Sequence, residues 1–424
     1  MAKIKYLLTL LMGLAAAASL TGTPPAAAKD FTFDEKTNAE IAKKLAIPVY
    51  FALPASARLP LTKSIETTDR LVDFKHPDGK GAKGDVGLRL VVAKRPGLAA
   101  RLGKSGLIET GDLLLTFRSE WGGAGAYPNV QMGISHTGVA YLKDGMVHNL
   151  DNPLTEEYLG PGMRGELNSE HYRTLKLIHV IRPRNLTDAQ KANLVEWSTR
   201  LATSARRVYP KEISFNQDYN APKFKDGKPL DFVKHLGQSA LGQKPAGTVD
   251  MFCSEFAWSL LALRDCNPAK TGDDFKGSRV PSCVKQVMEP MLATGNYITK
   301  RSRSSYSGLA EGPLLVVDAL GLPDTERDKL LHTVFIPNKQ GLAKMSVGHR
   351  QVAEKFQSQF EPLEKYYLGV HGKWGPSWSA RIISMGFRKG IPQNYSPTSF
   401  LINTLLPPNN SNRTMDYVAT ILIE

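Results

Sequence analysis

The chain has 424 residues, which is long for one ordinary core and predicts either one elaborated domain or two. Hydrophobic residues make up 42% of the chain and charged residues 22%, a balance that excludes intrinsic disorder and is typical of soluble globular proteins. The net charge of +14 favours anionic surroundings such as membrane headgroups or cell-wall polymers, unless it is only a solvated basic surface. No dense basic run with interleaved aromatic residues occurs, so we expect no nucleic-acid partner.

The first 28 residues have the three parts of a secretory signal. Lys3 and Lys5 precede an apolar stretch, 6–20, and the small residues 26–28 follow, as at a cleavage site. The apolar stretch is shorter than the ~20 residues that span a bilayer, and no other stretch is apolar enough to do so. We therefore predict an exported protein, periplasmic or extracellular, with no transmembrane segment once the signal is removed.

The three cysteines of the chain are Cys253, Cys266 and Cys283. The last two flank a polar loop, and a disulfide closing a loop of that length stabilises a protein by about 3 kcal/mol. This pairing would leave Cys253 as the free thiol of an exported chain. The alternative is three unpaired cysteines that pack as small hydrophobic side chains.

Before residue 106 the chain mixes short apolar runs with turns. The β-branched run at 88–94 predicts a strand, and the stretch from Pro96 to Gly103 or Gly106 predicts a helix. No role can be assigned to residues 29–105.

The elements become clearer from Ile108 onward. A turn at 110–112 opens into a strand, and two more strands follow, joined by Lys143, Asp144 and Gly145. These three strands are expected at 113–117, 135–142 and 146–150. In the glycine-rich loop between the first two, we expect Trp121 and Tyr127 to line a substrate groove, although surface aromatic residues without a role are the alternative.

Two helices are predicted in the middle of the chain. Thr187 and Gln190 form a capping box, and apolar residues at helical spacing continue to Pro210, which ends the helix. The second helix begins near Cys253 and is apolar almost all round, so we expect it to be buried. Beyond Cys283 we expect a strand at 312–320, a helix at 352–365 and a final strand at 416–424 that returns to a sheet.

Cys253 and His136 are the candidate reactive side chains. A thiol in the first turn of a helix meets backbone N–H groups and the positive end of the helix dipole, which favour the thiolate. His136 begins a strand in which Gly138 and Ala140 share its face, leaving room for another element such as the Cys253 helix. Taken alone, each residue is more often structural than catalytic.

Taken together, the segments TGDLLLT, SHTGVAYL and FCSEFAW resemble the circularly permuted branch of the NlpC-type papain-like cysteine hydrolases. This branch includes the YiiX-like bacterial proteins and lecithin retinol acyltransferase, and in it the histidine strand precedes the cysteine helix. The resemblance covers residues 107–152 and 246–265. It implies that Cys253 is the nucleophile, His136 its base, and a polar residue on the following strand the group that orients the base.

His148 matches that third position, with Asn149 and Asp151 as rivals. A two-residue turn at Asp144 and Gly145 would place His148 opposite Tyr141, on the wrong face of the hairpin. A three-residue loop would place it beside Ala140, on the face of His136. Glu255 also matches the family motif, and we interpret it mainly as a first-turn residue favoured by the helix dipole.

No metal-binding motif, phosphate loop or dinucleotide fingerprint occurs, so we expect neither a metal nor a cofactor. The expected fold is α+β, a permuted papain-like (NlpC-type) arrangement in which a small antiparallel sheet or half-barrel packs on the nucleophile helix. The expected domains are the signal at 1–28, an N-terminal region at 29–105, a catalytic domain at 106–320 with an insert at about 153–245, and a C-terminal elaboration at 321–424.

The expected activity is hydrolysis of amide bonds through a thioester, with peptidoglycan peptides as substrate. The alternatives are a lipid acyltransferase or thioesterase on the same fold, and an inactive protein that binds the cell wall or a partner.

Overall fold

We describe a computed structural model of the chain. The structure describes residues 29–45, 53–77, 86–116, 136–152, 177–215, 229–251, 253–288 and 397–424. The strands are β1 (Leu53–Pro54), β2 (Arg70–Lys75), β3 (Val86–Ala93), β4 (Leu113–Thr116), β5 (His136–Lys143), β6 (Met146–Leu150), β7 (Leu177–Pro183), β8 (Ile213–Phe215), β9 (Val249–Met251) and β10 (Met415–Ile423). The helices are α1 (Glu35–Leu45), α2 (Leu98–Ser105), α6 (Asp188–Val208), α8 (Pro229–Ala240), α9 (Cys253–Ala262) and α15 (Pro397–Thr404), with short 3-10 turns η2 (Ala55–Ala57) and η5 (Asp274–Lys276).

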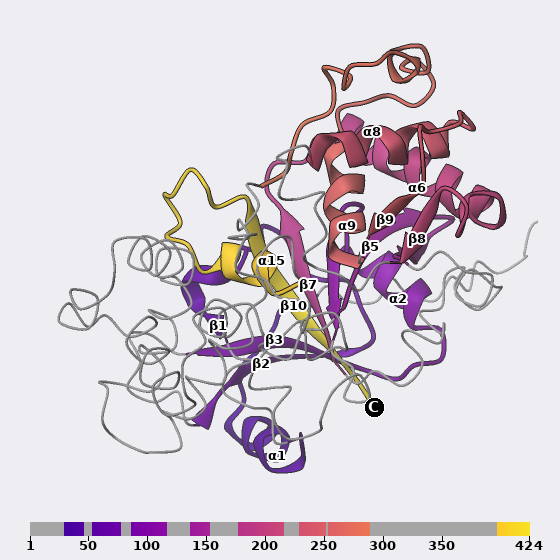
Figure 1. Ribbon diagram of the computed structural model, residues 1–424. Helices are drawn as coiled ribbons and strands as arrows, with labels where there is room; N and C mark the ends of the chain where they lie inside the picture. The colour runs from indigo at the N-terminus through magenta and orange to yellow at the C-terminus, as the bar shows by residue number, and fades with distance from the viewer. Residues whose placement is uncertain are drawn as a thin grey trace, which may run out of the picture.

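The fold is α+β, as predicted, and is built on one eight-stranded sheet. The strand order is β1-β3-β10-β7-β4-β5-β6, and β2 pairs with β3. The sheet is larger than the small antiparallel sheet expected, and it is mixed because β10 runs parallel to β3. The prediction that the final strand returns to the sheet is confirmed, and β10 lies in the interior, between β3 and β7 (Figure 1).

Both faces of the sheet are covered. The helices α6, α8, α9 and α15 share one hydrophobic core with one face, whereas α2 packs with residues of the other face. All nine residues of β10 are buried, which explains why this strand reads as a nearly continuous apolar run. Figure 1 shows α6, α8 and α9 grouped together beside the sheet, with α15 next to β10.

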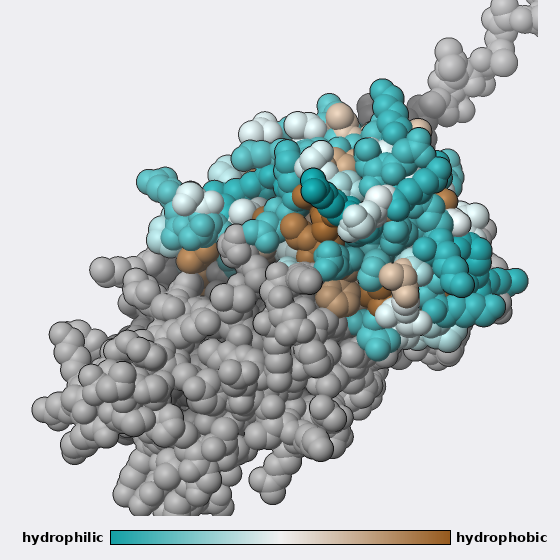
Figure 2. Space-filling model, turned by 45° about the horizontal axis from the view of Figure 1, so that its top comes forward, coloured by the Kyte–Doolittle hydropathy of each residue, from teal (hydrophilic) through white to brown (hydrophobic). Residues whose placement is uncertain are grey.

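The predicted capping box of α6 is confirmed. The Thr187 hydroxyl accepts a hydrogen bond from the Gln190 N–H at 3.2 Å, and the Gln190 side chain accepts one from the Thr187 N–H at 2.8 Å. One side of this helix is buried, and the outer face that carries α6 and α8 is mostly hydrophilic (Figure 2). Among the described residues, no helix is both long enough and apolar enough to cross a bilayer.

The hairpin of β5 and β6 closes with the two-residue turn. Lys143 pairs with Met146, and both turn residues have positive φ, 52° at Asp144 and 73° at Gly145. The helix α2 packs closely against this turn, since a Cβ on Gly103 would lie 2.4 Å from the Gly145 carbonyl oxygen. A glycine in α2 is therefore required for this contact.

Three of the stretches into which the sequence was divided contribute strands to the same sheet. The stretch 29–105 supplies β3, the predicted insert at 153–245 supplies β7, and the stretch 321–424 supplies β10. The elements expected at 312–320 and 352–365, and the predicted signal at 1–28, lie outside the described residues.

Candidate active site

Cys253 lies where the sequence predicts, at the first position of a buried helix. All ten residues of α9 are buried, and the Cys253 residue is 2% exposed. Burial raises the pKa of Cys253 to about 12, although hydrogen bonds from the backbone N–H groups of Thr137, Ser254 and Cys253 itself act to lower it. The resting sulfur is therefore a protonated thiol at neutral pH, the opposite of the expected thiolate, because desolvation outweighs the helix N-terminus.

The structure places the Cys253 sulfur near the start of β5, the strand that His136 begins. The sulfur accepts one of its hydrogen bonds from the N–H of Thr137, the residue directly after His136, and α9 packs against β5. The sulfur is buried, and desolvation is the largest influence on its pKa. The helix that carries it packs in the core of Val139 and Tyr141, whereas Ala140 faces the cluster of α2, so the small residues make room for α2 and not for α9.

His136 and Asp151 form a buried pair. The Nε2 atom of His136 lies 2.6 Å from Oδ2 of Asp151, and their side chains are 1% and 0% exposed. The negative charge of Asp151 also acts to raise the pKa of Cys253, so the carboxylate lies within electrostatic range of the sulfur. Asp151 thus relates the other two residues, since it bonds His136 and lies within electrostatic range of Cys253, and we treat these three buried residues as one group.

His148 does not take the third position. It pairs with Tyr141 and its ring stacks on the Tyr141 ring, with centroids 5.0 Å apart. The two-residue turn sets this register, so His148 lies on the face opposite to that of Asn149, which pairs with Ala140. The assignment of His148 as the partner of His136 is therefore wrong, and its rival Asp151 makes that contact.

The remaining predicted residues divide into two groups. Glu255 is buried in the first turn of α9, where the helix dipole favours a carboxylate. Trp121 and Tyr127, the expected groove residues, lie outside the described part of the chain.

Asn152 is a site residue that the sequence analysis missed. It is fully buried, and its Nδ2 donates to the Met251 carbonyl at 2.6 Å and to the Ser214 carbonyl at 3.2 Å. Met251 ends β9, the strand that leads into Cys253. No sequence signal marks this role, because the partners lie far away along the chain.

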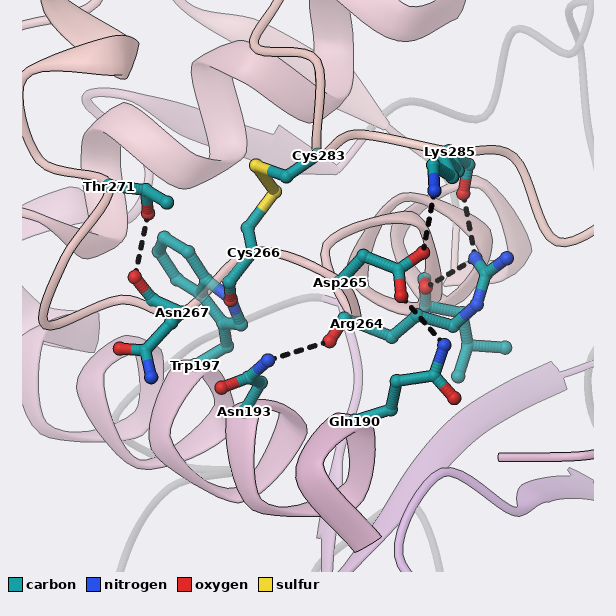
Figure 3. The surroundings of a disulfide bond; sticks show 11 residues. Gln190, Asn193, Trp197, Arg264, Asp265, Cys266, Asn267, Thr271, Cys283 and Lys285 are labelled. Atoms are coloured by element: carbon teal, nitrogen blue, oxygen red, sulfur yellow. Dashed lines mark hydrogen bonds and ion pairs between the residues drawn. A yellow bond between two sulfur atoms is a disulfide. The ribbon is translucent and has the colours of Figure 1, made fainter. Parts of the chain in front are cut away.

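The far end of α9 is held by a separate set of contacts. A disulfide joins Cys266 to Cys283, which confirms the predicted pairing and leaves Cys253 as the free cysteine. The Cys266 carbonyl accepts a hydrogen bond from Trp197 of α6 at 2.8 Å, and Asn193 of the same helix donates to the Arg264 carbonyl at 2.9 Å (Figure 3). The segment that follows α9 is therefore fixed against α6.

A small cavity of about 110 Å³ lies between β7 and α6, lined in part by Glu109, Asp112, Arg182 and Lys191. Arg182 bonds both carboxylates, at 2.8 Å to Asp112 and 2.9 Å to Glu109, and Lys191 also pairs with Glu109. These charges satisfy one another, so we interpret the cavity as part of a structural ion-pair network.

Within the described ranges, no cluster of histidine, cysteine, aspartate or glutamate residues could hold a metal ion. Comparison of the chain with protein-family models, with curated proteins and with solved structures finds no match, so the geometry of the Cys253, His136 and Asp151 group is what bears on function.

Proposed function

We propose that this chain is a cysteine hydrolase of the permuted papain-like type, in which Cys253 is the nucleophile, His136 the general acid and base, and Asp151 the group that orients His136. The observation that carries the proposal is the buried His136–Asp151 pair at 2.6 Å, directly beside the residue whose N–H bonds the Cys253 sulfur. A nucleophile, a base and an orienting group in this order are the parts that acyl transfer needs.

The reaction begins when the Cys253 sulfur attacks the carbonyl carbon of an amide while His136 takes the thiol proton. The tetrahedral intermediate then collapses, the carbon–nitrogen bond breaks, and His136 gives its proton to the leaving amine. Water attacks the resulting thioester with His136 as base, and the acid product leaves as the thiol regains its proton. No oxidant, metal or cofactor enters this cycle.

The raised pKa of the Cys253 thiol determines when its proton is transferred in the first step. Because burial holds Cys253 protonated, proton transfer to His136 accompanies the attack and does not precede it. Asp151 engages Nε2, so we assign the transfer to Nδ1. The carboxylate then stabilises the imidazolium that forms.

The proposal also includes export of the protein and the class of its substrate. The Cys266–Cys283 disulfide supports an oxidising compartment, in agreement with the signal-like N-terminus. The net charge of +14 supports an anionic environment, and we propose peptidoglycan peptides as the substrate. An acyl lipid is the alternative substrate on the same nucleophile.

The test uses the wild-type protein and the variants Cys253→Ala and Cys266→Ala/Cys283→Ala. Release of muropeptides from purified peptidoglycan, and release of fatty acid from acyl-lipid vesicles, are measured for each. We expect Cys253→Ala to abolish one of the two activities, while the double variant, which loses a distant disulfide, keeps it. Fatty acid release alone would move the proposal to the lipid class, and an activity unchanged in Cys253→Ala would overturn it.

A second candidate is an inactive protein that binds the wall or a partner, and the buried, protonated thiol favours it. Binding of peptidoglycan without turnover would support this candidate.

A further inference from the structure

Two adjacent residues at the end of the β5–β6 hairpin make contacts in different directions. Asp151 bonds His136 of β5, as described above, and Asn152 bonds carbonyls of β8 and β9. Since β9 ends two residues before Cys253, this dipeptide touches both halves of the candidate site.

The strand β9 is short, although Val249 and Met251 are buried in the main hydrophobic core. It is three residues long and, within the described part of the chain, pairs only with the equally short β8, in a parallel ladder of three residue pairs. Isolated two-stranded pairings are marginally stable in water. A buried amide that bonds a carbonyl of each strand supplies a link between this small sheet and the main sheet.

We propose that Asn152 is a positioning residue that fixes the end of β9, two residues before Cys253, and thereby holds the Cys253 sulfur beside Thr137, next to His136. This inference rests on the proposed function, because it names the residue that keeps the proposed nucleophile in register with its base.

The chemistry of the contact requires an amide. Both partners of Nδ2 are carbonyl oxygens, so the side chain must donate, and Nδ2 has two hydrogens for the two acceptors. Removing the donor leaves the two carbonyls without this partner in a buried place, which is costly. A carboxylate of the same shape repels both carbonyls when ionised and donates to one of them when protonated.

The experiment compares Asn152→Leu, which removes the donor, with Asn152→Asp, which restores one donor only at low pH. Asn193→Leu is the matched control, since Asn193 also donates Nδ2 to a carbonyl but at the other end of α9. Hydrogen–deuterium exchange of peptides covering residues 249–256 is measured in the full-length proteins at about pH 5 and about pH 8, each relative to wild type at the same pH.

We expect Asn152→Leu to speed exchange of this segment by at least about tenfold at both pH values. Burial among carbonyls raises the pKa of a carboxyl group, so Asn152→Asp should match Asn152→Leu at about pH 8 and approach wild type at about pH 5. Asn193→Leu should leave this segment at the wild-type rate. Unchanged exchange in Asn152→Leu, equal acceleration in Asn193→Leu, or no pH dependence in Asn152→Asp would each overturn the proposal.

Acylation of Cys253 by p-nitrophenyl acetate, followed by mass spectrometry, separates this inference from the proposed function. We expect Asn152→Leu to acylate at least about tenfold more slowly than wild type, and Asn193→Leu to acylate at the wild-type rate. Absence of acylation in the wild type would count against the proposed function alone, because the exchange measurement decides the role of Asn152 without any reaction.

Discussion

At the scale of single residues, the main feature of the candidate site is that its polar side chains are buried. Asp151 is 0% exposed, and a carboxylate in such a place persists only when it is paired or hydrogen-bonded. His136 is that hydrogen-bond partner, and the same bond fixes the position of its imidazole ring. Removing either side chain of the pair would leave the other in a low-dielectric environment, where the cost of an unpaired group is high.

We expect Asp151→Asn to lower the rate constant of hydrolysis by about 10²- to 10⁴-fold, because the amide no longer stabilises the imidazolium. His148→Phe is the control, since it keeps a ring against Tyr141, and it should change the rate by less than about twofold. The rates are measured on peptidoglycan with both folded variants. A large loss of rate in His148→Phe, together with an active Asp151→Asn, would show that His148 and not Asp151 orients His136.

The buried thiol predicts an unusual response to pH. Since burial raises the pKa of Cys253 from 9.0 to about 12, alkylation by iodoacetamide near neutral pH should be about a thousandfold slower in the folded protein than in urea. The pKa of Cys253 is higher in the folded protein than in the unfolded chain. The contribution of the buried thiol to the free energy of unfolding is therefore fully present below pH 9.0 and is lost as the pH rises from 9.0 towards about 12. Urea unfolding should show this alkaline loss in wild type and not in Cys253→Ala. An alkylation midpoint below the pKa of an ordinary thiol would contradict the prediction.

At the scale of elements, one hairpin turn determines which side chain meets His136. The sequence predicted β5, β6 and the helix starting at Cys253, because apolar period and turn residues are local signals. It also restricted the third residue to His148, Asn149 or Asp151. It could not choose among them, since a change of one residue in the turn exchanges the two faces of β6. The positive φ values of both Asp144 and Gly145 made that choice.

The disulfide at the far end of α9 is the second element-scale feature. Cys266→Ser/Cys283→Ser should lower the free energy of unfolding by about 3 kcal/mol, because the unfolded chain regains the freedom of the open loop. Urea unfolding with and without dithiothreitol measures this. Reductant should destabilise wild type by a similar amount and leave the double variant unchanged. Equal stability of reduced and oxidised wild type would show that the crosslink contributes nothing.

At the scale of the whole molecule, the sheet combines strands from distant parts of the chain. The sequence predicted that the final strand joins a sheet, but it gave no sign that this strand lies between β3 and β7. Pairing order depends on side-chain packing across the sheet, and no local pattern encodes it. The role of Asn152 was hidden for the same reason, because its partners on β8 and β9 are brought to it only by the tertiary fold.

Removal of residues 415–424 should prevent folding, because β10 pairs with both β3 and β7 and all nine of its residues are buried. Removal of Glu424 alone is the control, since this residue is exposed and follows the strand. Limited proteolysis and circular dichroism should show a folded control and an unfolded longer truncation. A truncated protein with native protease resistance would contradict the central place of β10.

The position of β10 has a consequence for the order of events during synthesis. Because residues 415–423 separate β3 from β7, the earlier strands cannot close their sheet while the ribosome is still making those residues. The complete eight-stranded sheet can therefore form only after residues 415–423 have left the ribosome, which makes the insertion of β10 a late step in folding.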